Sequence, residues 1–188
     1  HAERYPDFGT VWYWLAKYGR KAYPASFWEP GQPGYRDFVS LASLVLFALG
    51  SAAILLHGWG RRREPEGYPV AAAGLGILCL FLLTSKVHSP QYALWVAPLL
   101  AWLAIPWPLV IAYLAADVGV FVSGFYYFTV MDEPSPGWYG AFEAAVWVRA
   151  AALAGLLWAS LRAARTTPAG LPARPAPPGA VEISSQPA

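Results

Sequence analysis

The residues best suited to chemistry lie in one short polar stretch, Lys86-Val87-His88-Ser89-Pro90-Gln91-Tyr92. A serine followed by a proline is typical of a helix start, with Ser89 at the N-cap and Pro90 at the first helical position. The backbone N–H groups of Gln91 and Tyr92 would then lack helical partners, and a helix start attracts anions through such groups. The stretch therefore predicts a helix N-terminus that can bind a phosphate-sized anion.

Two basic side chains precede this predicted helix start. Lys86 lies at the end of a long apolar run, and His88 follows it by two residues. Both would add positive charge or hydrogen-bond donors beside the N-terminus, which strengthens the prediction of an anion site. The alternative is that Lys86 only caps the preceding helix and extends its ammonium to the membrane surface, while Ser89 and Pro90 only begin the next helix.

Two further charges lie inside apolar runs, Asp117 and Arg149. Charged side chains at such depth are costly and are usually paired or functional. A rise of about 1.5 Å per residue places Asp117 about 15 Å and Arg149 about 10 Å from the ends of their predicted spans on the same side of the membrane. The similar depths predict an ion pair that joins two helices, with a direct role of Arg149 in a binding site as the alternative.

The elements that must position these residues are membrane-spanning helices. The chain of 188 residues is 57% hydrophobic and 13% charged, whereas a soluble domain carries about 25% charged residues. A span needs about 20 apolar residues, and the sequence predicts an all-α, polytopic integral membrane protein. About five transmembrane helices are expected, at 38–57, 68–86, 92–105, 108–127 and 142–163. Collagen, coiled coils, disulfide scaffolds and basic nucleic-acid binders are excluded by this composition.

The remaining segments flank a transmembrane domain of residues 38–165. Residues 1–37 are expected to form an extracytoplasmic segment with a short amphipathic helix at the membrane interface, because aromatic and apolar residues recur there at helical spacing. Residues 166–188 are rich in proline and alanine and are expected to be a disordered cytoplasmic tail. The triple arginine 61–63 favours the cytoplasmic side for its loop, so the polar stretch would face outward. Cys79, the only cysteine, excludes an intrachain disulfide.

A resemblance to a known family is carried by residues 84–95, Thr84-Ser85-Lys86-Val87-His88-Ser89-Pro90-Gln91-Tyr92-Ala93-Leu94-Trp95, running on to Ala97-Pro98-Leu99-Leu100. The segment resembles the "KV-x-SPQY-x-LW" stretch of glycosyltransferase family 87, polytopic bacterial enzymes of the GT-C class that include α-mannosyltransferases. The opening His1-Ala2-Glu3-Arg4, followed by Gly9-Thr10-Val11-Trp12, resembles the "HAER" segment of that family. The resemblance covers residues 1–165. Ser85 and His88 depart from the family pattern, which often has asparagine and a bulky apolar residue at those places.

The resemblance implies a hexosyltransferase that moves a sugar, typically mannose, from a polyprenyl-phosphate donor to a lipid or glycan acceptor. The reaction would take place at the outer face of a bacterial plasma membrane. No cofactor and no metal-binding residue is expected in this sequence, and a metal requirement of the reaction stays open. In such enzymes an acidic residue of an early outer loop is the general base, so we expect that residue upstream of His1, in a longer protein. The residues expected to bind substrate here are Lys86, His88, Gln91, Arg4, Ser89 and Tyr92.

The alternative function is a non-catalytic polytopic membrane protein. It would be a transporter or flippase component for lipid-linked sugars, or a scaffold subunit that keeps the lipid-phosphate pocket. Membrane lipids are expected partners under either hypothesis, and nucleic acid is not.

Overall fold

A computed structural model describes residues 4–19, 32–63, 70–130 and 136–163. All secondary structure in these ranges is helical, which confirms the all-α fold class for the part of the chain described. The helices are α1 (Val11–Gly19), α3 (Pro33–Gly60), α4 (Val70–Thr84), α5 (Ala93–Trp102), α6 (Trp107–Phe125) and α7 (Pro136–Arg162). Single turns at Arg61–Arg63, Pro90–Tyr92 and Tyr126–Val130 extend or precede these helices. The predicted tail lies outside the described residues.

Three helical segments are long and apolar enough to cross a membrane: Pro33–Arg63, Trp107–Thr129 and Gly137–Arg162. The other two predicted spans form apolar helices that are shorter, with 15 residues in α4 and 10 in α5. At 1.5 Å per residue they measure about 22 Å and 15 Å, less than the roughly 30 Å hydrocarbon core of a bilayer. The structure therefore supports three spans by length and leaves five as a prediction.

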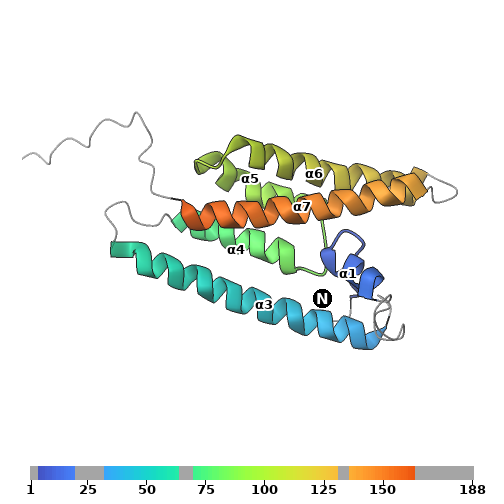
Figure 1. Ribbon diagram of the computed structural model, residues 1–188, viewed down its shortest axis with the longest axis horizontal. Helices are drawn as coiled ribbons and strands as arrows, with labels where there is room; N and C mark the ends of the chain where they lie inside the picture. The colour runs from blue at the N-terminus through green and yellow to red at the C-terminus, as the bar shows by residue number, and fades with distance from the viewer. Residues whose placement is uncertain (1–3, 20–31, 64–69, 131–135, 164–188) are drawn as a thin grey trace, which may run out of the picture.

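The long helices lie side by side with alternating direction, as Figure 1 shows. α7 packs against both α6 and α4, and α3 packs against α4. α1 lies at the end of the bundle where α3 begins, which we call the α1 end. At the opposite end, the Arg61 guanidinium donates to the backbone oxygens of Leu161 and Ala163. Arg61–Arg63 and Arg162 therefore share one end of the bundle.

α3 starts earlier than expected, at Pro33 rather than residue 38. Proline is favoured at the first helical position because its missing N–H would have no helical partner there. The added turns bring Arg36 and Asp37 onto the helix, although the sequence places them in a preceding loop. Much of the helix's apolar surface stays exposed, including Leu44 and Leu49, which suits a helix that faces lipid.

α1 is the short N-terminal helix that the sequence predicts, and its tryptophans pack against the rest of the protein. Trp12, Trp14 and Ala16 are buried, whereas Leu15 and Tyr18 are each more than 40% exposed. Trp14 packs with α6 and α7 side chains. Its indole N–H is satisfied by the Phe8 backbone oxygen at 2.9 Å. Trp12 and Trp14 thus attach the helix to two different buried clusters.

Candidate functional site

The segment after α4 carries Lys86, whose side chain turns toward α3. The residue is 8% exposed, and its ammonium lies 2.7 Å from the Ser40 hydroxyl oxygen on α3. Burial and the nearby Arg36 guanidinium lower the pKa of Lys86, while the Asp37 carboxylate opposes this change. A buried cation is costly unless it is paired or hydrogen-bonded, and the Ser40 hydroxyl is one polar contact that meets this need.

A groove of about 780 Å³ lies beside Lys86, between α3 on one side and α4 with the start of α5 on the other. Its apolar wall consists of Leu41, Leu44, Phe47, Phe81, Val87, Tyr92 and Trp95, and its polar lining of Asp37, Ser40, Ser43, Thr84, Ser85 and Lys86. The rings of Tyr92 and Trp95 are 4.8 Å apart at their centroids, and Phe81 lies 5.9 Å from Tyr92. The groove is therefore an aromatic channel with one buried lysine on its wall.

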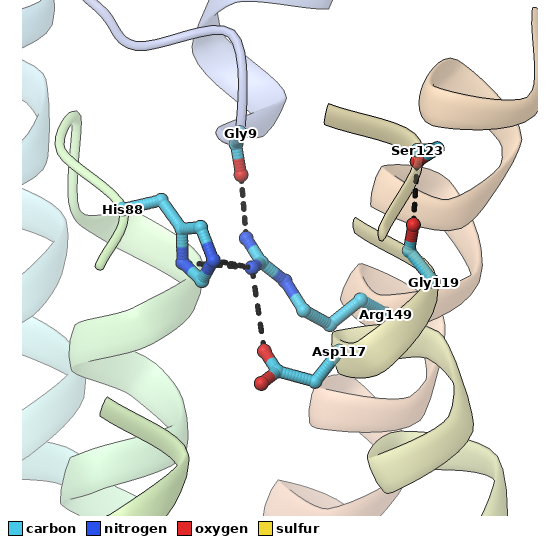
Figure 2. Close-up of polar contacts among 6 residues, drawn as sticks. All are labelled: Gly9, His88, Asp117, Gly119, Ser123 and Arg149. Atoms are coloured by element: carbon cyan, nitrogen blue, oxygen red, sulfur yellow. Dashed lines mark hydrogen bonds and ion pairs between the residues drawn. The ribbon is translucent and has the colours of Figure 1, made fainter. Parts of the chain in front are cut away.

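His88, two residues after Lys86, turns the other way, toward α7. Figure 2 shows its ring beside the Arg149 guanidinium, with one guanidinium nitrogen (Nη1) 2.7 Å from Nδ1 and 2.8 Å from Nε2. Arginine can only donate hydrogen bonds, so the neutral histidine must be the acceptor. Burial and the Arg149 charge together lower the pKa of His88 to about 3, which keeps the ring neutral at physiological pH.

Arg149 joins two more parts of the protein at the same place, which we call the Arg149 node (Gly9, His88, Asp117 and Arg149). Nη2 donates to the Gly9 backbone oxygen at 2.5 Å, and Nη1 lies 3.5 Å from the Asp117 carboxylate. The ion pair expected from the matched depths of Asp117 and Arg149 is thus present. The adjoining space is only about 10 Å³, at the lower limit for one water molecule, so the node leaves no room for a ligand.

Gly9 shows how closely the N-terminal segment approaches the segment after α4. A Cβ atom at this position would lie 2.9 Å from the His88 side chain. The Asp7 N–H donates to the Lys86 backbone oxygen at 2.8 Å, and the Trp12 indole N–H donates to the Thr84 oxygen at 2.8 Å. Residues 7–12 and 84–88, which are far apart in the sequence, therefore pack directly together.

The predicted cluster of Lys86 and His88 around one helix start is wrong, because the two side chains enter different sites. The expectation of an unpaired Tyr92 N–H is also wrong: it donates to the Ser89 oxygen at 3.0 Å. The chain makes a three-residue 3-10 turn, Pro90–Tyr92, before α5 begins, and such a turn bonds residue i to i+3. Ser89 has the extended backbone of an N-cap, but its hydroxyl makes no capping bond.

The other predicted site residues lie near these two sites. Tyr92 lines both the groove and the small space beside Arg149, so it forms the wall between them. Gln91 and Arg4 are exposed. Asp37 and Ser40 were missed as groove residues. Asp37, Ser40, Leu44 and Phe47 are spaced by three, four and three residues, which places them on one face of a helix. This spacing indicates a shared face only if the helix begins before residue 38.

Comparison with models of known protein families found no match, and comparisons with curated proteins and with solved structures found none either. A functional assignment therefore depends on the resemblance in residues 84–95 and on the geometry of the groove and the node. Of these two sites, the groove has volume for a ligand, and the node is filled by its own side chains.

Proposed function

We propose that this chain is the C-terminal part of a membrane glycosyltransferase. It would transfer a sugar, mannose in the first instance, from a polyprenyl-phosphate donor to a lipid or glycan acceptor at the outer face of a bacterial plasma membrane. The observation that carries the proposal is the position of Lys86, a nearly buried cation on the wall of an apolar groove of about 780 Å³. The proposed donor combines a negative phosphate with a long apolar chain, the two chemistries that this groove brings together.

The Lys86 ammonium would bind the donor phosphate, with the Ser40 hydroxyl as a neighbouring polar contact 2.7 Å from it. Negative charge grows on the phosphate as the bond to the sugar breaks. A positioned cation in a site shielded from water stabilises such developing charge, and the loss of one such donor typically costs about 100- to 1,000-fold in rate. Lys86 therefore acts on the leaving group, while the general base that activates the acceptor is proposed to lie outside this chain.

The apolar wall would hold the first isoprene units of the donor. Tyr92, Trp95 and Phe81 supply adjacent rings there, and Trp95 is half exposed, as a residue at an open groove would be. Gln91 and Arg4, both exposed, remain proposed contacts for the sugar or the acceptor. His88 changes role: its contacts with Arg149 make it part of the structural node, and we no longer propose it as a phosphate ligand.

A transfer assay with the full-length protein in membranes tests this function. Polyprenyl-phosphate mannose labelled in the sugar is supplied, and label transferred to lipid or glycan is counted. We expect transfer by the wild type and a loss of about 100-fold in Lys86→Ala, with insertion into the membrane unchanged. Lys17→Ala is the matched control, because Lys17 lies at the same end, pairs with Glu143 at 2.7 Å and does not line the groove.

Two results would count against the proposal in different ways. If Lys86→Ala transfers the sugar as fast as the wild type does, the donor phosphate does not bind at Lys86. Binding of the donor without transfer to any acceptor would favour the non-catalytic alternative, a scaffold or a component of a lipid-linked-sugar transporter.

A further inference from the structure

The groove wall contributed by α3 changes chemistry in a fixed order along the helix. Asp37, Ser40, Leu44 and Phe47 all line the groove, and their spacing of three, four and three places them on one helical face. At 1.5 Å per residue, the Ser40–Lys86 contact lies about 4.5 Å deeper than Asp37, and Phe47 about 10 Å deeper again. From the α1 end inward the groove thus presents a carboxylate, then an ammonium with a hydroxyl, then apolar side chains.

Charged side chains of both signs lie at the mouth of the groove. Asp37 and Lys86 line it, and the neighbouring Arg36 charge also acts on Lys86. The Arg36 guanidinium Nε holds one Asp37 carboxylate oxygen at 2.8 Å, which already neutralises that carboxylate. A phosphodiester carrying a neutral head group complements this arrangement. A zwitterionic head group would bring an ammonium to a carboxylate that is paired already.

We propose that Asp37 binds hydroxyl groups of the donor sugar, so that sugar, phosphate and isoprenoid chain lie in that order along α3. This inference rests on the proposed function and deepens it, because it assigns the sugar subsite. A carboxylate accepts hydrogen bonds at both oxygens and at several lone pairs, and sugar hydroxyls are donors. The Asp37 side chain is 64% exposed, so it is accessible at the mouth of the groove. Its bond to Arg36 fixes the carboxylate without using its full capacity.

Arg36 in turn has an orienting role in this subsite. Its guanidinium carbon lies 5.7 Å from the centre of the Tyr5 ring, and its backbone oxygen accepts the Ser40 hydroxyl at 2.8 Å. The same turn of α3 therefore holds the carboxylate proposed for the sugar and the hydroxyl that contacts Lys86. Sugar and phosphate recognition are linked through one rigid helical turn.

The test compares two lipids of equal charge on the detergent-solubilised full-length protein. One is polyprenyl-phosphate mannose, and the other is a polyprenyl phosphodiester with a methyl group in place of the sugar. Binding of each labelled lipid is measured for wild type, Asp37→Ala and Asp37→Asn. Asp37→Ala removes an anion beside Lys86, so the affinity for the methyl lipid should stay the same or rise, and the affinity for the mannose lipid should fall about tenfold relative to it. Asp37→Asn keeps one acceptor oxygen, so its affinity for the mannose lipid should fall less than that of Asp37→Ala.

Glu143→Gln is the matched control, since Glu143 is an acidic residue that pairs with Lys17 of α1 and does not line the groove; it should change neither affinity. An equal change in the affinity for both lipids, or no change in either affinity, would overturn the sugar subsite. Lys86→Ala distinguishes the phosphate site from the sugar subsite, because it should weaken the binding of both lipids equally. Wild-type protein that binds neither lipid would overturn the proposed function and this inference together.

Discussion

Lys86 and Arg149 are two nearly buried cations at neighbouring places in the same bundle, and their surroundings are opposite. Arg149 is 6% exposed and contacts a carboxylate, an imidazole and a backbone oxygen. The space beside it is about 10 Å³. Lys86 is 8% exposed and contacts a hydroxyl on the wall of a groove of about 780 Å³. Both charges are buried, but only one of them adjoins room for a ligand.

The difference separates a structural charge from one suited to binding. In a low-dielectric interior, a buried polar network is stabilising only when its members satisfy one another. The Arg149 node meets this condition with protein groups from four segments of the chain, and so it fixes the positions of those segments. At Lys86 the adjoining space is lined by aromatic rings. An anion that binds there interacts with a cation that the protein already shields from water, which strengthens their attraction.

The largest effect is expected from breaking the Arg149 node. Arg149→Gln removes the guanidinium that pairs with Asp117 and donates hydrogen bonds to His88 and the Gly9 oxygen. The Asp117 carboxylate is then buried without this partner. Such losses typically cost about 3–5 kcal/mol, and for a protein of this size each kcal/mol lowers the melting temperature by about 2–4 °C. Thermal unfolding in detergent should therefore show a fall in melting temperature of about 10 °C.

Asp117→Asn should have a smaller effect, because Asp117 contributes only one of the contacts of Arg149, at 3.5 Å. The double variant Asp117→Asn with Arg149→Gln removes both charges at once. It should be more stable than the sum of the two single losses predicts, since no carboxylate is then left unpaired. Strict additivity would show that the two residues do not act as a pair.

An intermediate effect is expected from filling the groove. Leu44 lines it and is 65% exposed, so Leu44→Trp places a large ring in the space without disturbing a buried contact. Binding of the polyprenyl-phosphate donor should weaken about tenfold while the melting temperature stays within about 2 °C, as expected for an exposed position. Leu49→Trp is the matched control, because Leu49 is 66% exposed on the same helix and lies outside the groove. Equal weakening in both variants would refute the groove as the lipid site.

The smallest effect is a pH dependence of the node. The pKa of His88 is lowered from 6.5 to about 3 in the folded protein, so the folded state keeps a neutral ring while the unfolded chain binds a proton below pH 6.5. Stability should therefore fall as the pH drops from 6.5 toward 3. At pH 5 the loss should be about 1 kcal/mol after allowance for the partial exposure of the ring. Arg149 is the charged group that contacts His88, and the charges of Asp117 and Asp7 act on Arg149.

Thermal unfolding between pH 7 and pH 5 measures this loss, with His88→Gln as the comparison. Glutamine keeps an acceptor for Arg149 and does not titrate, so its melting temperature should change less over this range. A wild-type curve that parallels the His88→Gln curve would contradict a neutral His88 in the node.

The sequence predicts the helices of the bundle well because long apolar runs are a strong signal. The predicted spans 108–127 and 142–163 agree closely with α6 and with most of α7. The prediction of five full-length spans is not supported to the same degree, because the chain leaves the helix after Thr84 and α5 stops at Trp102, four residues before Pro106. Local sequence indicates where these helices begin and end, but not how much of a bilayer they cross.

The candidate site was predicted less well, for a physical reason. The matched depths of Asp117 and Arg149 predict their contact because both residues lie on regular helices. The path of the chain between Ser85 and Ser89 follows no helical period, so nothing in the sequence assigns Lys86 and His88 to different sides. The bond from Arg149 to the Gly9 oxygen spans 140 residues, and a backbone acceptor carries no residue-type signal.

The central claim is that the two neighbouring cations have separate roles, and one paired measurement tests it directly. Binding of a polyprenyl phosphodiester and thermal unfolding are measured on the same preparations of wild type, Lys86→Ala and Arg149→Gln. We expect Lys86→Ala to weaken lipid binding about tenfold or more and to lower the melting temperature by much less than Arg149→Gln does, because it leaves no buried carboxylate without its partner. Arg149→Gln should lower the melting temperature by about 10 °C. Unchanged lipid affinity in Lys86→Ala, or a loss of stability equal to that of Arg149→Gln, would contradict this account.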